Sequence, residues 1–359
     1  MNTMLLFVSA GQVNAFSSNA RVGSRCGYRR VRPEVVAMAK GRDKLPEEGL
    51  VRPLINWYPG HIAKAEKKLK EMLSVVDVVI EMRDCRIPRS TAHPLVEKWV
   101  GVKPRVVAMN RSDMAPEKAK VMWKRHLADN GLNVFFTNAQ KGEGVPQLRR
   151  AALQAGAAMN EKRKKRGLLP RPVRCMVLGY PNVGKSALIN RLVNKRAAKS
   201  ENRPGVTRGL QWVRISKDIE LLDTPGIIPM KLVSQLTASR LAVCDDIGEA
   251  SYDNQLVAAF LAEELRSVST RINGFVDMER IEERYGVKFG EMAGDEYLFA
   301  VADKSFAADT ERFARRFLTD FRSGLLGELA LESPDERETE ENDARGEENQ
   351  APGAEDFTF

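Results

Sequence analysis

The chain has 359 residues, 43% of them hydrophobic, which is enough for two domains with buried cores and additional tails. Its formal net charge is +9, but residues 333–359 contain ten acids and two arginines, so the rest of the chain carries +17 and should favour a polyanionic partner, first of all nucleic acid. The four cysteines are scattered without a C-x-x-C, which argues against a zinc site or a disulfide framework, and no apolar run is long enough to span a bilayer.

The first 45 residues have the composition of a disordered organelle presequence. Residues 1–40 contain several serines, five arginines and one lysine, but a single acid, Glu34. The apolar patch LLFVSAG also fits the core of a signal peptide, as in the first half of a two-part plastid address. A plain disordered tail is the third interpretation.

Short runs rich in valine and isoleucine alternate with helical patterns from residue 75 onwards. We predict buried strands at 75–82, 104–110, 133–139, 173–179, 210–216 and 219–226. Between them, residues 117–131 have a helical pattern that ends at a glycine stop signal. This alternation predicts an α/β domain over residues 46–232, with a mostly parallel sheet and helices on both faces.

The stretch GYPNVGKS, residues 179–186, matches the phosphate-binding pattern G-x-x-x-x-G-K-[ST] between a predicted strand and a helix. Gly179 and Gly184 let backbone N–H groups curl around phosphates, and the helix N-terminus adds partial positive charge. We expect Lys185 to reach the β- and γ-phosphates and the Ser186 hydroxyl to bind Mg²⁺.

Two motifs near this loop suit magnesium and the γ-phosphate. In DTPG, residues 223–226, Asp223 can hold Mg²⁺ through water and the Gly226 N–H can meet the γ-phosphate. In PGVTRG, residues 204–209, Thr207 is expected to supply a second magnesium hydroxyl.

Two upstream motifs close predicted strands and suit a guanine base. In NRSD, residues 110–113, the Asp113 carboxylate can accept from N1–H and the 2-amino group of guanine, while Asn110 braces the loop. In TNAQKG, residues 137–142, the Ala139 N–H can donate to the guanine O6.

The five motifs follow the order base-reading, base-backing, phosphate loop, switch and magnesium, which is the usual GTPase set rotated in sequence. Ligands bind outside the carboxyl ends of the strands in such a sheet. A changed order of the motifs in the sequence therefore leaves the site intact, provided that the termini of the usual domain are joined, and residues 145–172 make that connection here. We therefore predict a circularly permuted P-loop GTPase domain, then a small all-helical domain over 233–330 and an acidic disordered tail over 331–359.

With these motifs in place, the sequence resembles the circularly permuted ribosome-assembly GTPases, closest to ribosome biogenesis GTPase A and its chloroplast and mitochondrial relatives. The resemblance covers roughly residues 54–325 and also rests on NWYPGHIAKA, residues 56–65, and MRDCRIPRSTAHP, residues 82–94. The chain departs from the family at Cys85, where alanine is usual, at Arg111, where lysine is usual, and at Asn138, where serine is usual.

The residue after DTPG is Ile227, which cannot hydrogen-bond the attacking water that a glutamine orients in many GTPases. The resemblance suggests His61 as the catalytic substitute; a structural helix-capping histidine is the alternative. Asn182 resembles an asparagine that binds an activating potassium ion in related GTPases, and an ordinary turn residue is again the alternative. The expected nucleotide-binding residues are Asn110, Arg111, Asp113, Asn138, Ala139, Asn182, Val183, Gly184, Lys185, Ser186, Ala187, Thr207 and Gly226.

Basic segments suggest where RNA binds. NEKRKKRG, residues 160–167, lies in the joining segment, and Arg312, Arg315, Arg316 and Arg322 make the last helix of the second domain basic. Phosphate contacts are expected, because aromatic residues are not interleaved with the charges. A solvated linker and a structural cap are the alternatives, while the resemblance implies that the helical domain binds ribosomal RNA.

We therefore expect a monomeric GTPase that binds GTP and GDP, needs Mg²⁺ and uses K⁺, and hydrolyses GTP slowly unless ribosomal particles stimulate it. The expected partners are the large ribosomal subunit precursor and its rRNA, in the plastid stroma or alternatively the mitochondrial matrix, without a membrane. A nucleotide-gated RNA-binding scaffold with negligible hydrolysis and a cytosolic or nucleolar permuted GTPase are the competing hypotheses.

Overall fold

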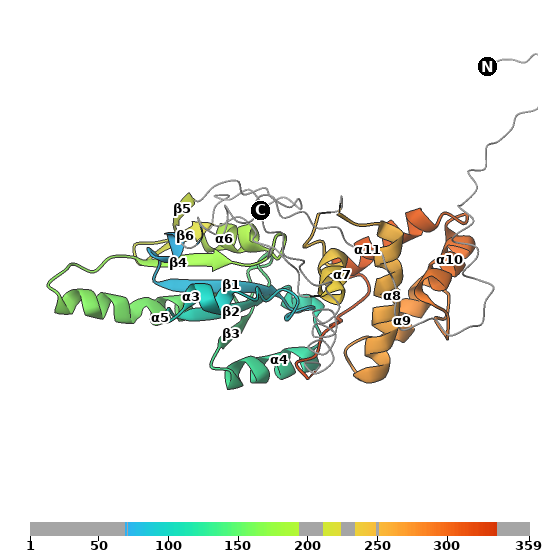
Figure 1. Ribbon diagram of the computed structural model, residues 1–359, viewed down its shortest axis with the longest axis horizontal. Helices are drawn as coiled ribbons and strands as arrows, with labels where there is room; N and C mark the ends of the chain where they lie inside the picture. Colours follow the sequence, from blue (N-terminus) through green and yellow to red (C-terminus); the bar gives the residue numbers. More distant parts are fainter. Residues whose placement is uncertain (1–68, 70, 194–210, 224–233, 249–250, 336–359) are drawn as a thin grey trace, which may run out of the picture. The chain divides into compact units, whose positions relative to one another are not determined.

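The computed structural model describes residues 69, 71–193, 211–223, 234–248 and 251–335 (Figure 1). These residues all belong to one compact unit of the chain, Arg52–Phe359. Three of the expected site residues, His61, Thr207 and Gly226, lie outside the described ranges. The expected presequence lies outside them as well.

A six-stranded sheet forms the centre of the first domain. Its strands are β1 (Val78–Asp84), β2 (Arg105–Asn110), β3 (Asn133–Phe136), β4 (Val173–Leu178), β5 (Gln211–Arg214) and β6 (Ile219–Asp223). Their spatial order is β3-β2-β1-β4-β6-β5, and every neighbouring pair is parallel except β5 with β6. The predicted mostly parallel sheet is therefore confirmed, with β5 as an antiparallel edge strand.

Helices cover both faces of this sheet. Successive residues of the central strands point to opposite sides, so each face presents apolar side chains that the helices bury. The helices are α3 (Val96–Val100), α4 (Glu117–Asp129), α5 (Val145–Lys165) and α6 (Lys185–Val193). Val78 and Ile80 of β1 pack with α5 and α6 in one core. Val79 faces α3 on the other side, and Val107 of β2 packs there with α4.

After the sheet, the described residues form a second, helical domain with five α-helices (Figure 1). They are α7 (Gln235–Val243), α8 (Asn254–Arg271), α9 (Met278–Tyr285), α10 (Gly294–Ser305) and α11 (Thr310–Arg322). Four of these helices begin with a side-chain N-cap of the favoured residue types. Ser234 caps α7, and Asp253, Asp277 and Asp309 cap α8, α9 and α11. None of the described helices combines the length and the hydropathy that crossing a membrane requires.

The chain packs beyond the predicted end of the helical domain. Composition places the start of the acidic tail at residue 331, but Leu331, Glu332 and Ser333 are buried. The backbone N–H groups of Leu329 and Leu331 donate to the carbonyls of Met114 and Arg86 in the sheet domain. We call residues 329–333 the C-terminal strap, because they tie the end of the helical domain to the sheet domain.

Candidate functional site

Asn110, the last residue of β2, connects three of the predicted motif loops. Its Nδ2 donates to the carbonyl of Val183 at 2.8 Å, and its Oδ1 accepts from the N–H of Ala139 at 3.0 Å. The Thr137 hydroxyl lies 3.4 Å from the same oxygen. Asn110 therefore holds the base-reading, base-backing and phosphate loops together. In the structure the Ala139 N–H donates to Asn110, and its contact with the guanine O6 stays a prediction.

Close backbone approach explains both glycines of the phosphate loop. A Cβ at Gly184 would lie 2.2 Å from the Asn110 Nδ2, and a Cβ at Gly179 would lie 2.6 Å from the Met82 carbonyl oxygen. Both glycines also have positive φ angles, which side chains disfavour. The loop therefore closes against β1 and Asn110 only because these two positions lack side chains.

The base-reading and base-backing loops meet through a salt bridge. Asp113 lies in a 3₁₀ turn, Ser112–Met114, and its carboxylate is 3.0 Å from the Lys141 Nζ. The Asn138 Oδ1 accepts from the N–H groups of Gln140 and Lys141, so this asparagine shapes the turn that carries Lys141. The two loops therefore place a carboxylate and an ammonium group side by side at the ends of β2 and β3.

The lysine of the phosphate loop, Lys185, is buried. It begins α6, and its Nζ donates to the Tyr180 carbonyl at 2.6 Å. Val183 is buried, and Ser186 and Ala187 are half-buried in the first turn of α6. A helix N-terminus with a lysine and a hydroxyl is suited to phosphates. The magnesium set is only partly described, because Thr207 and the side chain of Asp223 lie outside the described parts.

The helical domain touches this loop directly. The Asn182 Nδ2 donates to the carbonyl of Asp245 at 2.6 Å, and Asp245 follows α7 with a left-handed φ of 65°. The Tyr180 side chain is 1% exposed and belongs to the same core as the helices α7 to α11. The Asn182 amide nitrogen is therefore engaged with the helical domain.

The loop that follows β1 contains a buried ion pair. The Asp84 carboxylate accepts two hydrogen bonds from the Arg86 guanidinium, at 3.0 and 2.8 Å, and both side chains are almost fully buried. Burial would raise the pKa of Asp84, but Arg86 and Arg111 outweigh it and hold this pKa below its ordinary value. Asp84 is therefore an ionised carboxylate inside the protein.

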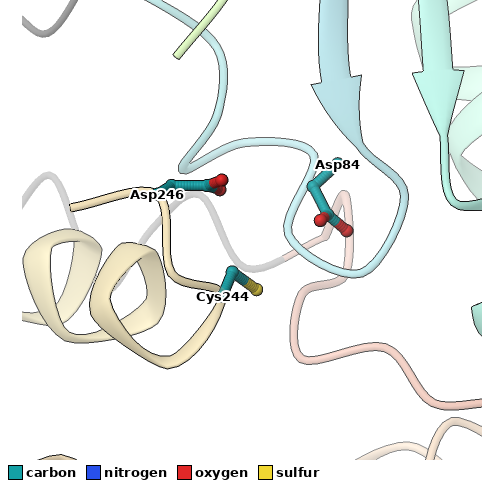
Figure 2. A group of neighbouring side chains, drawn as sticks. All are labelled: Asp84, Cys244 and Asp246. Atoms are coloured by element: carbon teal, nitrogen blue, oxygen red, sulfur yellow. The ribbon is translucent and has the colours of Figure 1, made fainter. Parts of the chain in front are cut away.

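A second carboxylate, Asp246, lies near this pair (Figure 2). Ligand atoms of Asp84, Cys244 and Asp246 lie within 4.8 Å of one another, and all three side chains are buried. Among the described residues, neither oxygen of Asp246 has a hydrogen-bond partner. Burial and the neighbouring Asp84 raise the pKa of Asp246 well above its ordinary value, which favours the neutral acid.

The donor set of this cluster fits a metal ion poorly. Arg86 already neutralises Asp84 with a bidentate contact, and Arg111 adds a second positive charge nearby. Burial also raises the pKa of the Cys244 thiol well above its usual range, whereas a metal ligand must be a thiolate. We therefore interpret the cluster as a polar contact between the domains.

Glu332 of the C-terminal strap completes this contact. Its carboxylate accepts from the N–H groups of Arg89 and Ser90, at 2.6 and 3.1 Å, and from the Ser90 hydroxyl. Arg240 of α7 lies 3.4 Å from the same carboxylate, and the Trp123 Nε1 donates to the Glu332 carbonyl. The strap therefore joins α4, α7 and the loop after β1.

The sequence predicted the site residues at the ends of the strands, but it did not predict the residues that connect the two domains. The motif positions Asn110, Asp113, Ala139 and Asn182 lie on adjoining loops, as the parallel sheet implies. Tyr180, Asp246 and Glu332 were not singled out. Burial of the last two depends on partners far away in sequence, and no local pattern signals it.

Comparisons with known proteins agree with this arrangement. A model of the family described as 50S ribosome-binding GTPase matches residues 174–283. Ribosome biogenesis GTPase A of Bacillus licheniformis is 35% identical over 285 residues, which cover 79% of this chain and 99% of the relative. Mitochondrial ribosome-associated GTPase 1 of Bos taurus is 32% identical and covers 82% and 92% of the two chains.

Two solved structures share the fold. The GDP-bound structure of TM YlqF is 25% identical with a TM-score of 0.52, and it covers 75% of this chain and all of the other. GNP-bound YlqF from T. maritima is 26% identical with a TM-score of 0.51, covering 76% and 99%. Loop geometry, sequence and fold lead to one conclusion: the chain is a GTPase that belongs to the ribosome biogenesis GTPase A family.

Proposed function

We propose that the protein assists assembly of the large ribosomal subunit in an organelle, and that GTP binding and hydrolysis control its association with the precursor particle. The observation that carries this proposal is the similarity to ribosome biogenesis GTPase A over 79% of the chain and nearly the whole relative. GTP favours binding to the particle and hydrolysis favours release, because a ligand shifts an equilibrium only toward the state that it binds better.

The charge of the protein supports an RNA partner. Residues 162–166 at the end of α5 are all basic, and four of these five residues are exposed, with Arg163 half-buried. On α11, Arg312, Arg315 and Arg316 are exposed, although the last two pair with Glu311 and Asp320. The fourth arginine, Arg322, donates to the carbonyls of Val243 and Ala242 at the end of α7, so it has a structural role.

Two separate lines of support favour an organelle, and each favours a different compartment. The arginine-rich residues 1–45 favour a presequence, and the plastid is our first assignment because of the two-part address that LLFVSAG suggests. The mitochondrial names of relatives such as the bovine protein favour the mitochondrial matrix. Import of the tagged full-length chain into isolated plastids and mitochondria, with processing of its N-terminus, separates the two compartments.

The chemistry that we assign uses Mg²⁺ on the Ser186 hydroxyl, with Thr207 and Asp223 as further ligands and K⁺ on the Asn182 oxygen. Lys185 stabilises the charge of the transferred phosphoryl group. His61 orients the attacking water, because Ile227 cannot do so. Particle contact brings His61 into position.

Co-sedimentation with organelle ribosomal particles tests the proposal. The full chain is mixed with large-subunit precursors in the presence of a non-hydrolysable GTP analogue or of GDP. We expect the protein in the particle fractions with the analogue and in the free fractions with GDP. Equal distribution in the two nucleotide states would contradict nucleotide-controlled association.

One observation favours a second candidate, a nucleotide-gated RNA-binding scaffold. Ile227 stands where many GTPases carry the glutamine that orients the attacking water, and its side chain cannot hydrogen-bond water. Such a protein would show the same nucleotide-dependent co-sedimentation with negligible hydrolysis on the particle. Single-turnover hydrolysis on the particle therefore separates the two candidates.

A further inference from the structure

Arg111 has an unusual position between the two domains. It occupies the second position of the base-reading motif, and its backbone has a left-handed φ of 59°. Its Nη2 donates to the Asn182 carbonyl of the phosphate loop at 3.0 Å. Its Nη1 lies 3.5 Å from the Asp84 Oδ2. One side chain therefore contacts the phosphate loop and the loop after β1 at the same time.

This double contact depends on the guanidinium group. Arginine presents several donors in a rigid plane, whereas lysine offers one compact ammonium group on a flexible stem. A lysine at this position could donate to the Asn182 carbonyl or pair with Asp84, but it could not place separate nitrogens on both. We call the arrangement of Asn182, Arg111 and Asp84 the Arg111 fork.

Asp84 continues the connection into the helical domain. Its bidentate partner Arg86 donates to the carbonyl of Phe321 in α11 at 3.3 Å, and the Arg86 guanidinium lies 4.7 Å from the centre of the Phe321 ring. The carbonyl of Arg86 accepts from the N–H of Leu331 in the C-terminal strap. An unbroken series of polar contacts therefore runs from the phosphate loop to α11.

The charges along these polar contacts make their stability depend on the position of Arg111. Two buried carboxylates, Asp84 and Asp246, lie close to each other (Figure 2), and Asp84 also lies 3.5 Å from the Arg111 guanidinium. The positive charge of Arg111 opposes the effect of burial on the pKa of both groups. The pKa of Asp84 is lowered overall, whereas that of Asp246 stays raised. Moving Arg111 would therefore leave two desolvated acids with less compensation, and their surroundings in both domains would have to adjust.

We propose that Arg111 is a positioning residue that couples guanine-nucleotide binding to the helical domain through the Arg111 fork and the Asp84–Arg86 ion pair. Nucleotide orders the base-reading and phosphate loops, which carry Arg111 and Asn182. The fork then holds Asp84, and Asp84 holds Arg86 against α11. The coupling is reciprocal, so a change in α11 must alter nucleotide affinity.

A double-mutant cycle with GDP tests this coupling in the free protein. Phe321→Leu removes the ring beneath Arg86 and keeps the backbone carbonyl. Arg111→Lys keeps one donor for the Asn182 carbonyl and removes the fork. Phe313→Leu is the matched control, because Phe313 is an equally buried residue of α11 that packs on Tyr285, Phe306 and Phe317.

Titration with fluorescent GDP gives the affinities, and thermal melts verify that each variant is folded. We expect Arg111→Lys alone to weaken GDP binding by a similar factor, roughly 3- to 10-fold, because removing the fork removes the same coupling. Phe321→Leu should weaken GDP binding roughly 3- to 10-fold when Arg111 is present and less than about 2-fold in the Arg111→Lys background. Phe313→Leu should lower the melting temperature comparably and leave GDP affinity within about 2-fold.

Three results would each overturn the assignment. They are equal losses from Phe321→Leu in the two backgrounds, no loss from Phe321→Leu when Arg111 is present, and an equal loss from Phe313→Leu. The experiment needs neither ribosomal particles nor hydrolysis. A failure here is therefore distinguishable from a failure of the ribosomal role that we propose above.

Discussion

At the scale of single residues, Asp113 should decide which base the protein accepts. Its carboxylate lies at the end of β2 beside Lys141, and a guanine edge offers it two donors. Asp113→Asn should weaken GDP binding by about 1.5–3 kcal/mol, roughly 10- to 100-fold, and improve binding of xanthosine diphosphate. Competition titrations with fluorescent GDP measure both changes. Displacement of GDP by ATP as readily as by GTP would refute the guanine assignment.

Asp246 should give the folding stability a distinctive pH dependence. Burial and the neighbouring Asp84 raise its pKa well above the ordinary value of an aspartate, although Arg111 and Arg86 oppose this. An acid with a raised pKa contributes stability that is complete below its unfolded pKa and is lost as pH rises through its folded pKa. Asp246→Asn should remove this loss, so it should stabilise the protein more at pH 8 than at pH 5.

Denaturant unfolding at these two pH values checks the prediction for Asp246. Asp129→Asn on α4 is the control, because the Asp129 side chain is 72% exposed. The control should change stability similarly at both pH values. A constant effect of Asp246→Asn across the two values would show that Asp246 titrates as it does in the unfolded chain.

At the scale of elements, the sequence predicted the strands well because their apolar runs are long and local. β2 and β4 begin and end within one residue of the predicted ranges, and β2 ends at the motif residue Asn110. Elements that depend on distant partners could not be predicted. The strap is an example, because LALES continues into an acidic sequence and Glu332 is buried through contacts with Ser90 and Arg240.

The same reason explains the missed parts of the site. Asp84 and Arg86 are two residues apart, but nothing in their spacing indicates that Arg111 and Asp246 approach them. The left-handed backbone of Asp245 brings its carbonyl to Asn182. The sequence could not predict this conformation, because the residue there is aspartate and not glycine. Contacts of this kind arise only when the two domains pack.

The C-terminal strap should contribute measurably to stability. Glu332→Ala removes an acceptor for two N–H groups and leaves Arg240, which is 3% exposed, with fewer partners. Loss of one partner from a buried charged network costs about 3–5 kcal/mol. Glu328→Ala, an exposed neighbour, should change stability by less than about 0.5 kcal/mol. Chemical denaturation measures both, and similar values for the two variants would deny the strap this role.

The basic end of α5 should make RNA binding depend on salt. Replacing Lys162, Lys164 and Lys165 with glutamine removes three exposed charges and leaves the helix core unchanged. Each lost phosphate contact should reduce the slope of log affinity against log salt by about 0.7–0.9. Filter binding of rRNA fragments between low and moderate salt gives this slope. An unchanged slope would identify the segment as a linker.

At the scale of the whole molecule, the nucleotide loops and the helical domain form a continuous structure. Tyr180 of the phosphate loop packs in the core of the helical domain, and Asn182 bonds to the residue that follows α7. A partner that binds the helical domain can therefore act on the phosphate loop. This arrangement suits an enzyme that is slow alone and becomes active on a ribosomal particle.

The most direct test is the single-turnover rate of GTP hydrolysis with and without large-subunit precursor particles. Ile227 stands where many GTPases carry the glutamine that orients water, and completing a GTPase site supplies on the order of 10³–10⁵ in rate. We predict stimulation of about 10³ by the particle, and its loss in His61→Ala with GTP binding intact. The same slow rate in the presence and absence of particles would contradict the account.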